Sequence, residues 1–155
     1  MAIVSIDPFT GKQIKTFEAQ SQEAAQQKIN KAQMAFLGWS ELSIEMRSDF
    51  MLKLADKMET KASAYARLIS VEMGKPAEQG KAEILKCAKM IRYYVENAED
   101  FLSDKEIKSE SYETSKVCYK PLGPILGIMP WNFPYWQVLR FAVPTILAGN
   151  TVLIK

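Results

Sequence analysis

Apolar residues recur at the three- and four-residue spacing of an α-helix over most of the first 102 positions. Ser21 is expected to cap a first helix that ends near Trp39, and Ser43 is expected to cap a second. A third helix should end at Gly74, and Pro76 suits the first turn of a longer fourth. The expected inward faces are Ala25, Ile29, Ala32 and Phe36 in the first helix, and Ile84, Cys87, Ala88, Ile91, Val95, Ala98 and Leu102 in the fourth.

Two hairpins are expected outside this helical region. Residues 3–6 and 13–17 are strand-like and flank a turn that contains Pro8 and Gly11. Residues 103–120 alternate polar and apolar side chains, which is typical of a hairpin or extended arm with at least one exposed face.

The most informative segment is 121–155, which reads as strand, helix and strand. An apolar run is followed by a crowded turn, an amphipathic stretch, a Gly-Asn stop and a second β-branched run. Such a unit builds a parallel sheet, so the pattern predicts an α/β fold. The turn at 129–134 should lie beyond the carboxyl end of the first strand, where open α/β sheets bind ligands.

Composition narrows the function classes. A net charge of +2, without a basic cluster interleaved with aromatic residues, gives no reason to expect nucleic acid. The sequence has no histidine, which excludes imidazole catalysis and histidine-ligated metal sites, and we expect no metal. Cys87 and Cys118 fit no C-x-x-C pattern, and each is expected to be a buried thiol. No secretory signal or membrane span is evident, so a reducing cytoplasm is expected.

Two polar residues in the last segment have both a structural and a functional interpretation. Asn132 is either a turn or cap residue near the helix that begins around Pro134, or a fixed amide donor for an oxygen that becomes negative during reaction. Lys155 is either a solvated terminal lysine or a cation at a strand end that reaches a nucleotide's ribose or phosphate. Spacing alone leaves both questions open.

The segment Gly127-Ile128-Met129-Pro130-Trp131-Asn132-Phe133-Pro134, with the stretch from Pro144 to Lys155, resembles the first signature block of the aldehyde dehydrogenase superfamily. The segment Glu72-Met73-Gly74-Lys75-Pro76, with Glu83-Ile84 and Tyr93-Tyr94 after it, is similar to that family's N-terminal helical region. The resemblance covers the whole chain in order and is closest to succinate-semialdehyde dehydrogenases. It favours the functional interpretation of Asn132.

The resemblance implies a role for each residue of this block. Asn132 would help to form the oxyanion hole for the aldehyde oxygen. An arginine at the position of Arg140 would pair with the remote carboxylate of succinate semialdehyde, because a guanidinium stays charged and binds carboxylates with two parallel bonds. A plain surface role for Arg140 remains open. The NAD or NADP cofactor is expected against Ile128, Met129, Pro130, Trp131 and Lys155, and the substrate against Phe133, Gln137 and Arg140.

The resemblance also implies that the chain is the N-terminal part of a longer fold. Residues 1–102 would form a hairpin and the helical part of the cofactor-binding domain, 103–120 an oligomerisation arm, and 121–155 the first strand–helix–strand of the cofactor sheet. Family members are several times longer and carry their catalytic cysteine further downstream, so neither cysteine here inherits that role. The intact protein is expected to be a homo-oligomer. The alternative is a non-catalytic module that docks on a full-length relative.

Overall fold

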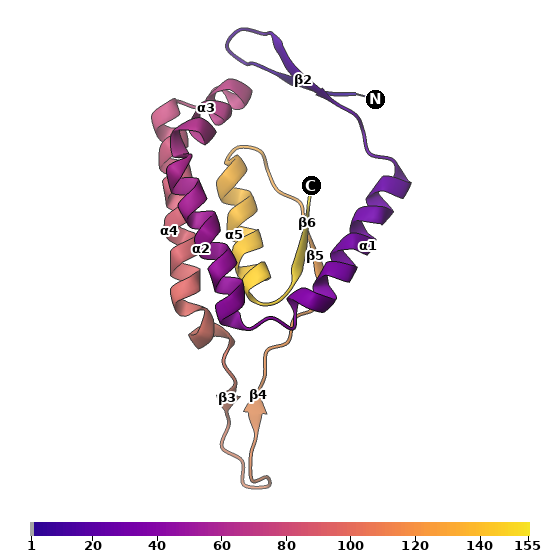
Figure 1. Ribbon diagram of the computed structural model, residues 1–155, viewed down its shortest axis with the longest axis vertical. Helices are drawn as coiled ribbons and strands as arrows, with labels where there is room; N and C mark the ends of the chain where they lie inside the picture. Colours follow the sequence, from indigo (N-terminus) through magenta and orange to yellow (C-terminus); the bar gives the residue numbers. More distant parts are fainter. Residues whose placement is uncertain (1) are drawn as a thin grey trace.

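The computed structural model describes residues 2–155, which form five helices and three two-stranded sheets. The central helix α5 lies between α2 and α4 on one side and the strands β5 and β6 on the other, with α1 beyond these strands (Figure 1). The helices are α1 (Gln22–Trp39), α2 (Ile44–Thr60), α3 (Ala62–Met73), α4 (Ala77–Leu102) and α5 (Pro134–Leu147). The strands are β1 (Ile3–Ile6), β2 (Gln13–Phe17), β3 (Lys105–Glu106), β4 (Lys116–Val117), β5 (Pro124–Gly127) and β6 (Thr151–Ile154).

The predicted helix signals are confirmed at three boundaries. The hydroxyls of Ser21 and Ser43 accept hydrogen bonds from backbone N–H groups in the first turns of α1 and α2. Gly74 ends α3 with a φ of 73°, a left-handed conformation that glycine adopts without a Cβ penalty. Pro76 stands one residue earlier than expected, at the N-cap of α4 rather than inside its first turn.

The core forms where α2, α3, α4 and α5 pack together. Its fully buried side chains come mainly from the inward stripe of α4, and Ile84, Cys87, Ala88 and Ile91 have no exposed surface. Burying such apolar side chains is the main stabilising contribution to a fold of this size. The 3.6-residue pattern of α4 therefore predicts five of its seven expected inward residues correctly, while Val95 and Leu102 are half-buried.

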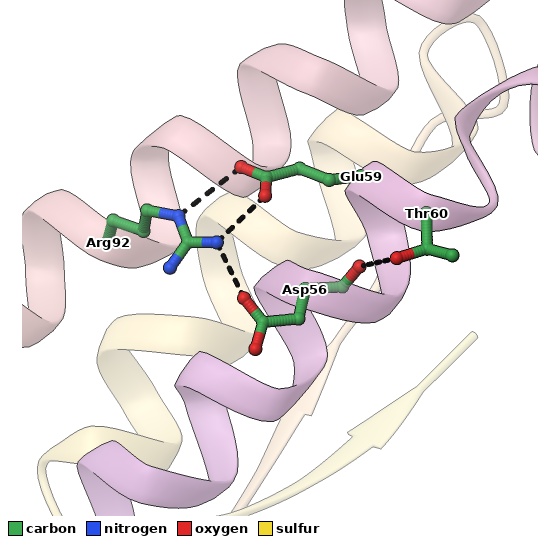
Figure 2. Close-up of polar contacts among 4 residues, drawn as sticks. All are labelled: Asp56, Glu59, Thr60 and Arg92. Carbon is green, nitrogen blue, oxygen red and sulfur yellow. Dashed lines mark hydrogen bonds and ion pairs between the residues drawn. The ribbon is translucent and has the colours of Figure 1, made fainter.

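A surface ion cluster also joins α2 to α4 (Figure 2). The Arg92 guanidinium of α4 donates to the carboxylates of Asp56 and Glu59 on α2, with N···O distances of 2.7 Å and 2.8 Å for the two shorter contacts. These hydrogen bonds raise the pKa of Arg92 and lower the pKa of Glu59. Because the cluster is exposed, it adds little stability to two helices that the core already holds together.

The predicted strand–helix–strand unit is present. β5 and β6 pair in parallel with Gly127 opposite Ile154, and α5 connects them. The turn after α5 is fixed by Gly149, with a φ of 87°, and by buried Asn150. The Asn150 Oδ1 atom accepts from the N–H groups of Leu122 and Gly123, which locks the start of β5 beside the start of β6.

Both predicted hairpins are also present. β1 pairs antiparallel with β2. β3 pairs antiparallel with β4, and this second hairpin projects away from the helical body (Figure 1). The structure does not test whether the projecting hairpin mediates oligomerisation.

Two expectations about burial were wrong. Cys118 is exposed, because it follows the short strand β4 on the projecting hairpin, which no other element of residues 2–155 covers. Ala25 and Ile29 on α1 are exposed as well, and only Ala32 and Phe36 of that expected face are half-buried. Helical periodicity identifies which face is apolar, but it does not identify a partner that covers the face.

Within residues 2–155, every helix is too short or too polar to cross a membrane.

Candidate active site

The candidate site lies at the carboxyl ends of the two parallel strands. The Lys155 N–H donates to the Gly127 carbonyl, and the Met129 N–H donates to the Lys155 carbonyl, both at 2.9 Å. These two bonds continue the β5–β6 ladder past its last residues and fix the start of the turn. Ile128 and Trp131 are 70% and 78% exposed, and Lys155 is exposed beside them.

The end of β5 lies very close to α5. A Cβ atom placed on Gly127 would lie 2.5 Å from the Phe141 ring and 2.9 Å from the end of the Met129 side chain. A larger residue at 127 would force the Phe141 ring and the Met129 side chain to move. The close packing of the end of β5 against α5 therefore depends on this residue.

Asn132 lies at the outer part of the turn with an exposed side chain. It is not the helix cap, because Phe133 occupies the N-cap position of α5 and supplies no capping side chain. That part of the structural interpretation is therefore wrong. The Asn132 amide stands next to the N-terminus of α5, where backbone dipoles favour negative charge.

The missing cap of α5 is supplied by another helix. Glu83 of α4 accepts hydrogen bonds at its Oε1 atom from the backbone N–H groups of Tyr135 and Trp136, each at 3.1 Å. Its other carboxylate oxygen pairs with the Lys75 ammonium, and the two side chains are only 3% and 10% exposed. The Lys75 Nζ atom also lies 3.7 Å from the centroid of the Phe133 ring. The charged pair therefore contacts both ends of the Phe133–Trp136 segment.

The sequence analysis did not predict this role for Glu83 and Lys75. A signal was present, because Glu83 lies on the inward stripe of α4 beside Gly80, Ile84 and Cys87, where an unpaired charge would be costly. A carboxylate in such a stripe indicates a buried partner. The identity of the partner, the first turn of α5, depends on contacts 52 and 53 positions away.

Two of the expected substrate residues share a cavity. Phe133 and Gln137 line a hollow of about 430 Å³ together with Trp136 of α5 and residues of α4. Two lysines, Lys75 and Lys86, also line the hollow. The Lys86 Nζ atom lies 3.9 Å from the centroid of the Trp136 ring. The hollow combines aromatic walls with amide and ammonium groups, which suits a small polar molecule.

Arg140 lies outside the lining of this hollow. It is exposed on α5, three residues after Gln137 and therefore about one helical turn further from Asn132. Its assignment to the substrate stays a prediction, as do the assignments of Asn132, Phe133 and Gln137.

The residues expected to hold a dinucleotide fit that ligand chemically. Ile128 and Trp131 offer exposed apolar surface for a flat ring, and Lys155 offers an ammonium for a ribose hydroxyl or a phosphate. These three residues lie at the carboxyl end of a parallel strand pair, which is the usual position of such ligands in α/β sheets. Among residues 2–155, no group of three or more His, Cys, Asp or Glu side chains is placed to hold a metal ion.

The two cysteines should differ strongly in reactivity. Burial, reinforced by the nearby Glu83 carboxylate, raises the pKa of the Cys87 thiol from 9.0 to about 12. The thiolate is the reactive form, so Cys87 should react much more slowly than an exposed thiol. We expect iodoacetamide to modify exposed Cys118 in the folded protein and Cys87 only after unfolding in urea, as read by peptide mass spectrometry. Rapid modification of Cys87 in the folded protein would contradict the burial described here.

Comparison with known proteins agrees with this geometry. The family model described as "Aldehyde dehydrogenase family" matches residues 1–155. The chain is 42% identical over 155 residues to a protein of Synechocystis sp. named "Probable succinate-semialdehyde dehydrogenase [NADP(+)]", covering all of this chain and 34% of the relative. It is 40% identical over 157 residues to a Mycobacterium leprae protein named "Succinate-semialdehyde dehydrogenase [NADP(+)]", again covering all of this chain and 34% of the relative.

A solved structure shows the same fold. The succinic semialdehyde dehydrogenase of Streptococcus pyogenes, in complex with NADP+ as the cofactor, superposes with a TM-score of 0.92 at 25% identity. The match covers 97% of this chain and 33% of the other chain. The chain thus spans about a third of the length of the relatives it matches. Its sequence and its α/β architecture, with the Pro-Trp-Asn-Phe-Pro turn at the carboxyl end of β5, show that the chain belongs to the aldehyde dehydrogenase family.

Proposed function

We propose that this chain contributes part of the active site for NADP-dependent oxidation of an aldehyde, succinate semialdehyde, to its carboxylic acid. The observation that carries the proposal is the Asn132 amide, which is exposed, is not used as a helix cap and lies in the turn beyond a parallel strand pair. The choice of substrate and cofactor rests on the names of the relatives that match the whole chain.

In this proposal Asn132 stabilises negative charge on the aldehyde oxygen. When a thiolate adds to the aldehyde carbon, the carbonyl oxygen becomes an alkoxide, and the Asn132 NH₂ group donates a hydrogen bond to it. The attacking thiolate is proposed to come from a part of the fold outside residues 1–155, since Cys87 is buried in the helical core, Cys118 is on the projecting hairpin, and neither has the family's sequence context.

The dinucleotide is proposed to lie against Ile128, Met129, Pro130, Trp131 and Lys155. When bound, it supplies the acceptor for hydride from the aldehyde carbon. The side chains at 128–131 exclude water from one side of the site, and the Lys155 ammonium holds a polar group of the ligand.

Two further features fit this function. The projecting β3–β4 hairpin offers backbone edges and exposed Tyr112 and Val117 for contact with a second copy, and we propose that it contributes to a homo-oligomer.

Both cysteines are free, and an exposed thiol such as Cys118 persists in a reducing compartment, which favours the cytoplasm.

The direct test uses the full-length gene product that contains this chain. We expect NADP reduction with succinate semialdehyde, followed by absorbance at the nicotinamide wavelength, and a smaller rate with NAD. The 155-residue chain alone should show no such activity. Absence of turnover by the full-length protein with succinate semialdehyde and with neutral aldehydes, under both cofactors, would overturn the proposal.

Arg140 provides a test of the substrate assignment. Loss of one charge-assisted contact costs about 1.5–3 kcal/mol, so Arg140→Ala should lower kcat/KM for succinate semialdehyde about tenfold to a hundredfold. A neutral aldehyde of similar length should be affected less than about threefold, because it offers no carboxylate to lose. Arg67→Ala, at another exposed arginine on α3, is the matched control. Equal losses for both aldehydes would show that Arg140 does not recognise the carboxylate.

A further inference from the structure

The turn that carries Asn132 is held at two separate anchors. At one end the Met129 N–H bonds to the carbonyl of Lys155, the residue directly after β6. At the other end Glu83 binds the N–H groups of Tyr135 and Trp136 in α5. Asn132 lies three residues from Met129 and three from Tyr135, at the middle of the span between these anchors.

The second anchor is buried and charged. The Glu83 side chain is 3% exposed, and both of its oxygens are in use, one by α5 and one by Lys75. Lys75 connects the same carboxylate to the Phe133 ring, directly after Asn132. An anchor made of charge-assisted hydrogen bonds at a helix N-terminus resists displacement more than a neutral cap would.

We propose that Glu83, paired with Lys75, is a positioning residue for the oxyanion donor: it fixes the first turn of α5 and the Phe133 ring so that the Asn132 amide keeps its place when charge develops on the substrate. The inference rests on the proposed function, because it assigns Asn132 the donor role. Glu83 lines the hollow that Phe133 and Gln137 share, but α5 and Lys75 already engage both of its carboxylate oxygens. It acts on turnover only through the turn.

The test is a double-mutant cycle in the full-length enzyme. Glu83→Gln keeps an acceptor for Tyr135 and Trp136 but removes the charge that holds Lys75. We expect it to lower kcat about tenfold or more, with KM for both substrates changed less than about twofold, because a misplaced donor weakens transition-state binding. In the Asn132→Ala background the same change should lower kcat less than about twofold, since residues that act as a unit are non-additive.

This cycle separates positioning from mere stability. A structural defect would reduce the active fraction equally in both backgrounds, and such additive losses would overturn the proposal. Glu96→Gln, at an exposed carboxylate on the same helix, is the matched control and should leave kcat unchanged.

Amide hydrogen exchange gives a readout that does not depend on activity. In Glu83→Gln we expect faster exchange in peptides that span residues 129–137, with unchanged exchange in the middle of α2. Unchanged exchange around Asn132 would overturn the anchor itself. If the unmodified full-length protein oxidises no aldehyde, the proposed function fails and the catalytic consequence fails with it, while the exchange result still decides whether Glu83 holds the turn.

Discussion

Replacing Asn132 with alanine in the full-length enzyme is expected to lower kcat about 100- to 1,000-fold, the effect of removing one oxyanion donor, or about 3–4 kcal/mol of transition-state stabilisation. The reason is that the amide strengthens its hydrogen bond only when the aldehyde oxygen becomes negative. The affinity for the dinucleotide should change little, because its expected contacts lie on the preceding residues of the turn. Turnover under saturating conditions and dinucleotide binding by fluorescence titration measure the two effects separately.

Asn132→Asp is the informative companion to Asn132→Ala. It keeps the size of the side chain but replaces a donor with a carboxylate, which repels a developing oxyanion, so it should be at least as inactive as the alanine variant. A matched control is Asn97→Ala, which removes a half-buried amide that donates to the Tyr93 carbonyl in α4, far along the chain. If single-turnover kinetics show an unchanged chemical step in Asn132→Ala, the amide is a turn residue and the oxyanion assignment is wrong.

The helices and strands of this protein can be predicted from its sequence because the local signals for their ends agree with the apolar pattern. Ser21, Ser43 and Gly74 mark helix ends by hydrogen bonds or backbone conformations within a few residues, and the structure confirms each of them. The strand–helix–strand unit is equally clear, because Pro134 begins α5 and Gly149 ends the turn after it. The sequence therefore predicts that the Pro-Trp-Asn-Phe-Pro turn lies at a strand end.

The long-range contacts were not readable in the same way. The sequence identifies Asn150 only as part of the Gly-Asn pair that ends the amphipathic stretch. In the structure its side chain is buried and accepts from the N–H groups of Leu122 and Gly123. Glu83 appeared only in a family-like segment, yet it caps α5. Both side chains satisfy backbone groups that are distant in the chain, and no periodicity encodes such a partner.

Burial on the outer elements was mispredicted for a related reason. The apolar spacing of α1 predicted its helical state correctly, but Ile29 is 45% exposed because none of the elements in residues 2–155 covers that part of the face. Alternating residues near Cys118 predicted extended structure correctly, but the hairpin projects from the body. The pattern of apolar residues identifies a face that can be buried. Whether that face is buried depends on the elements that pack against it.

The buried Lys75–Glu83 pair beside the candidate site should contribute strongly to stability. Lys75→Met leaves the Glu83 carboxylate buried without its cation, and breaking a buried pair from one side costs about 3–5 kcal/mol. The two backbone N–H donors of α5 still solvate the carboxylate, so we expect a loss of about 3 kcal/mol in the free energy of unfolding, the lower end of that range. Urea unfolding followed by circular dichroism measures this loss.

Comparison with two other variants shows whether the loss comes from the uncompensated charge. Lys81→Met removes an exposed lysine from α4 and should change stability by less than about 0.5 kcal/mol. The double variant Lys75→Met/Glu83→Gln removes both charges and keeps an acceptor for α5, so it should recover at least about 1 kcal/mol relative to Lys75→Met alone. A Lys75→Met variant as stable as Lys81→Met would show that solvent compensates the Glu83 charge. A double variant less stable than Lys75→Met would instead show that the carboxylate at the N-terminus of α5 stabilises the fold without its lysine.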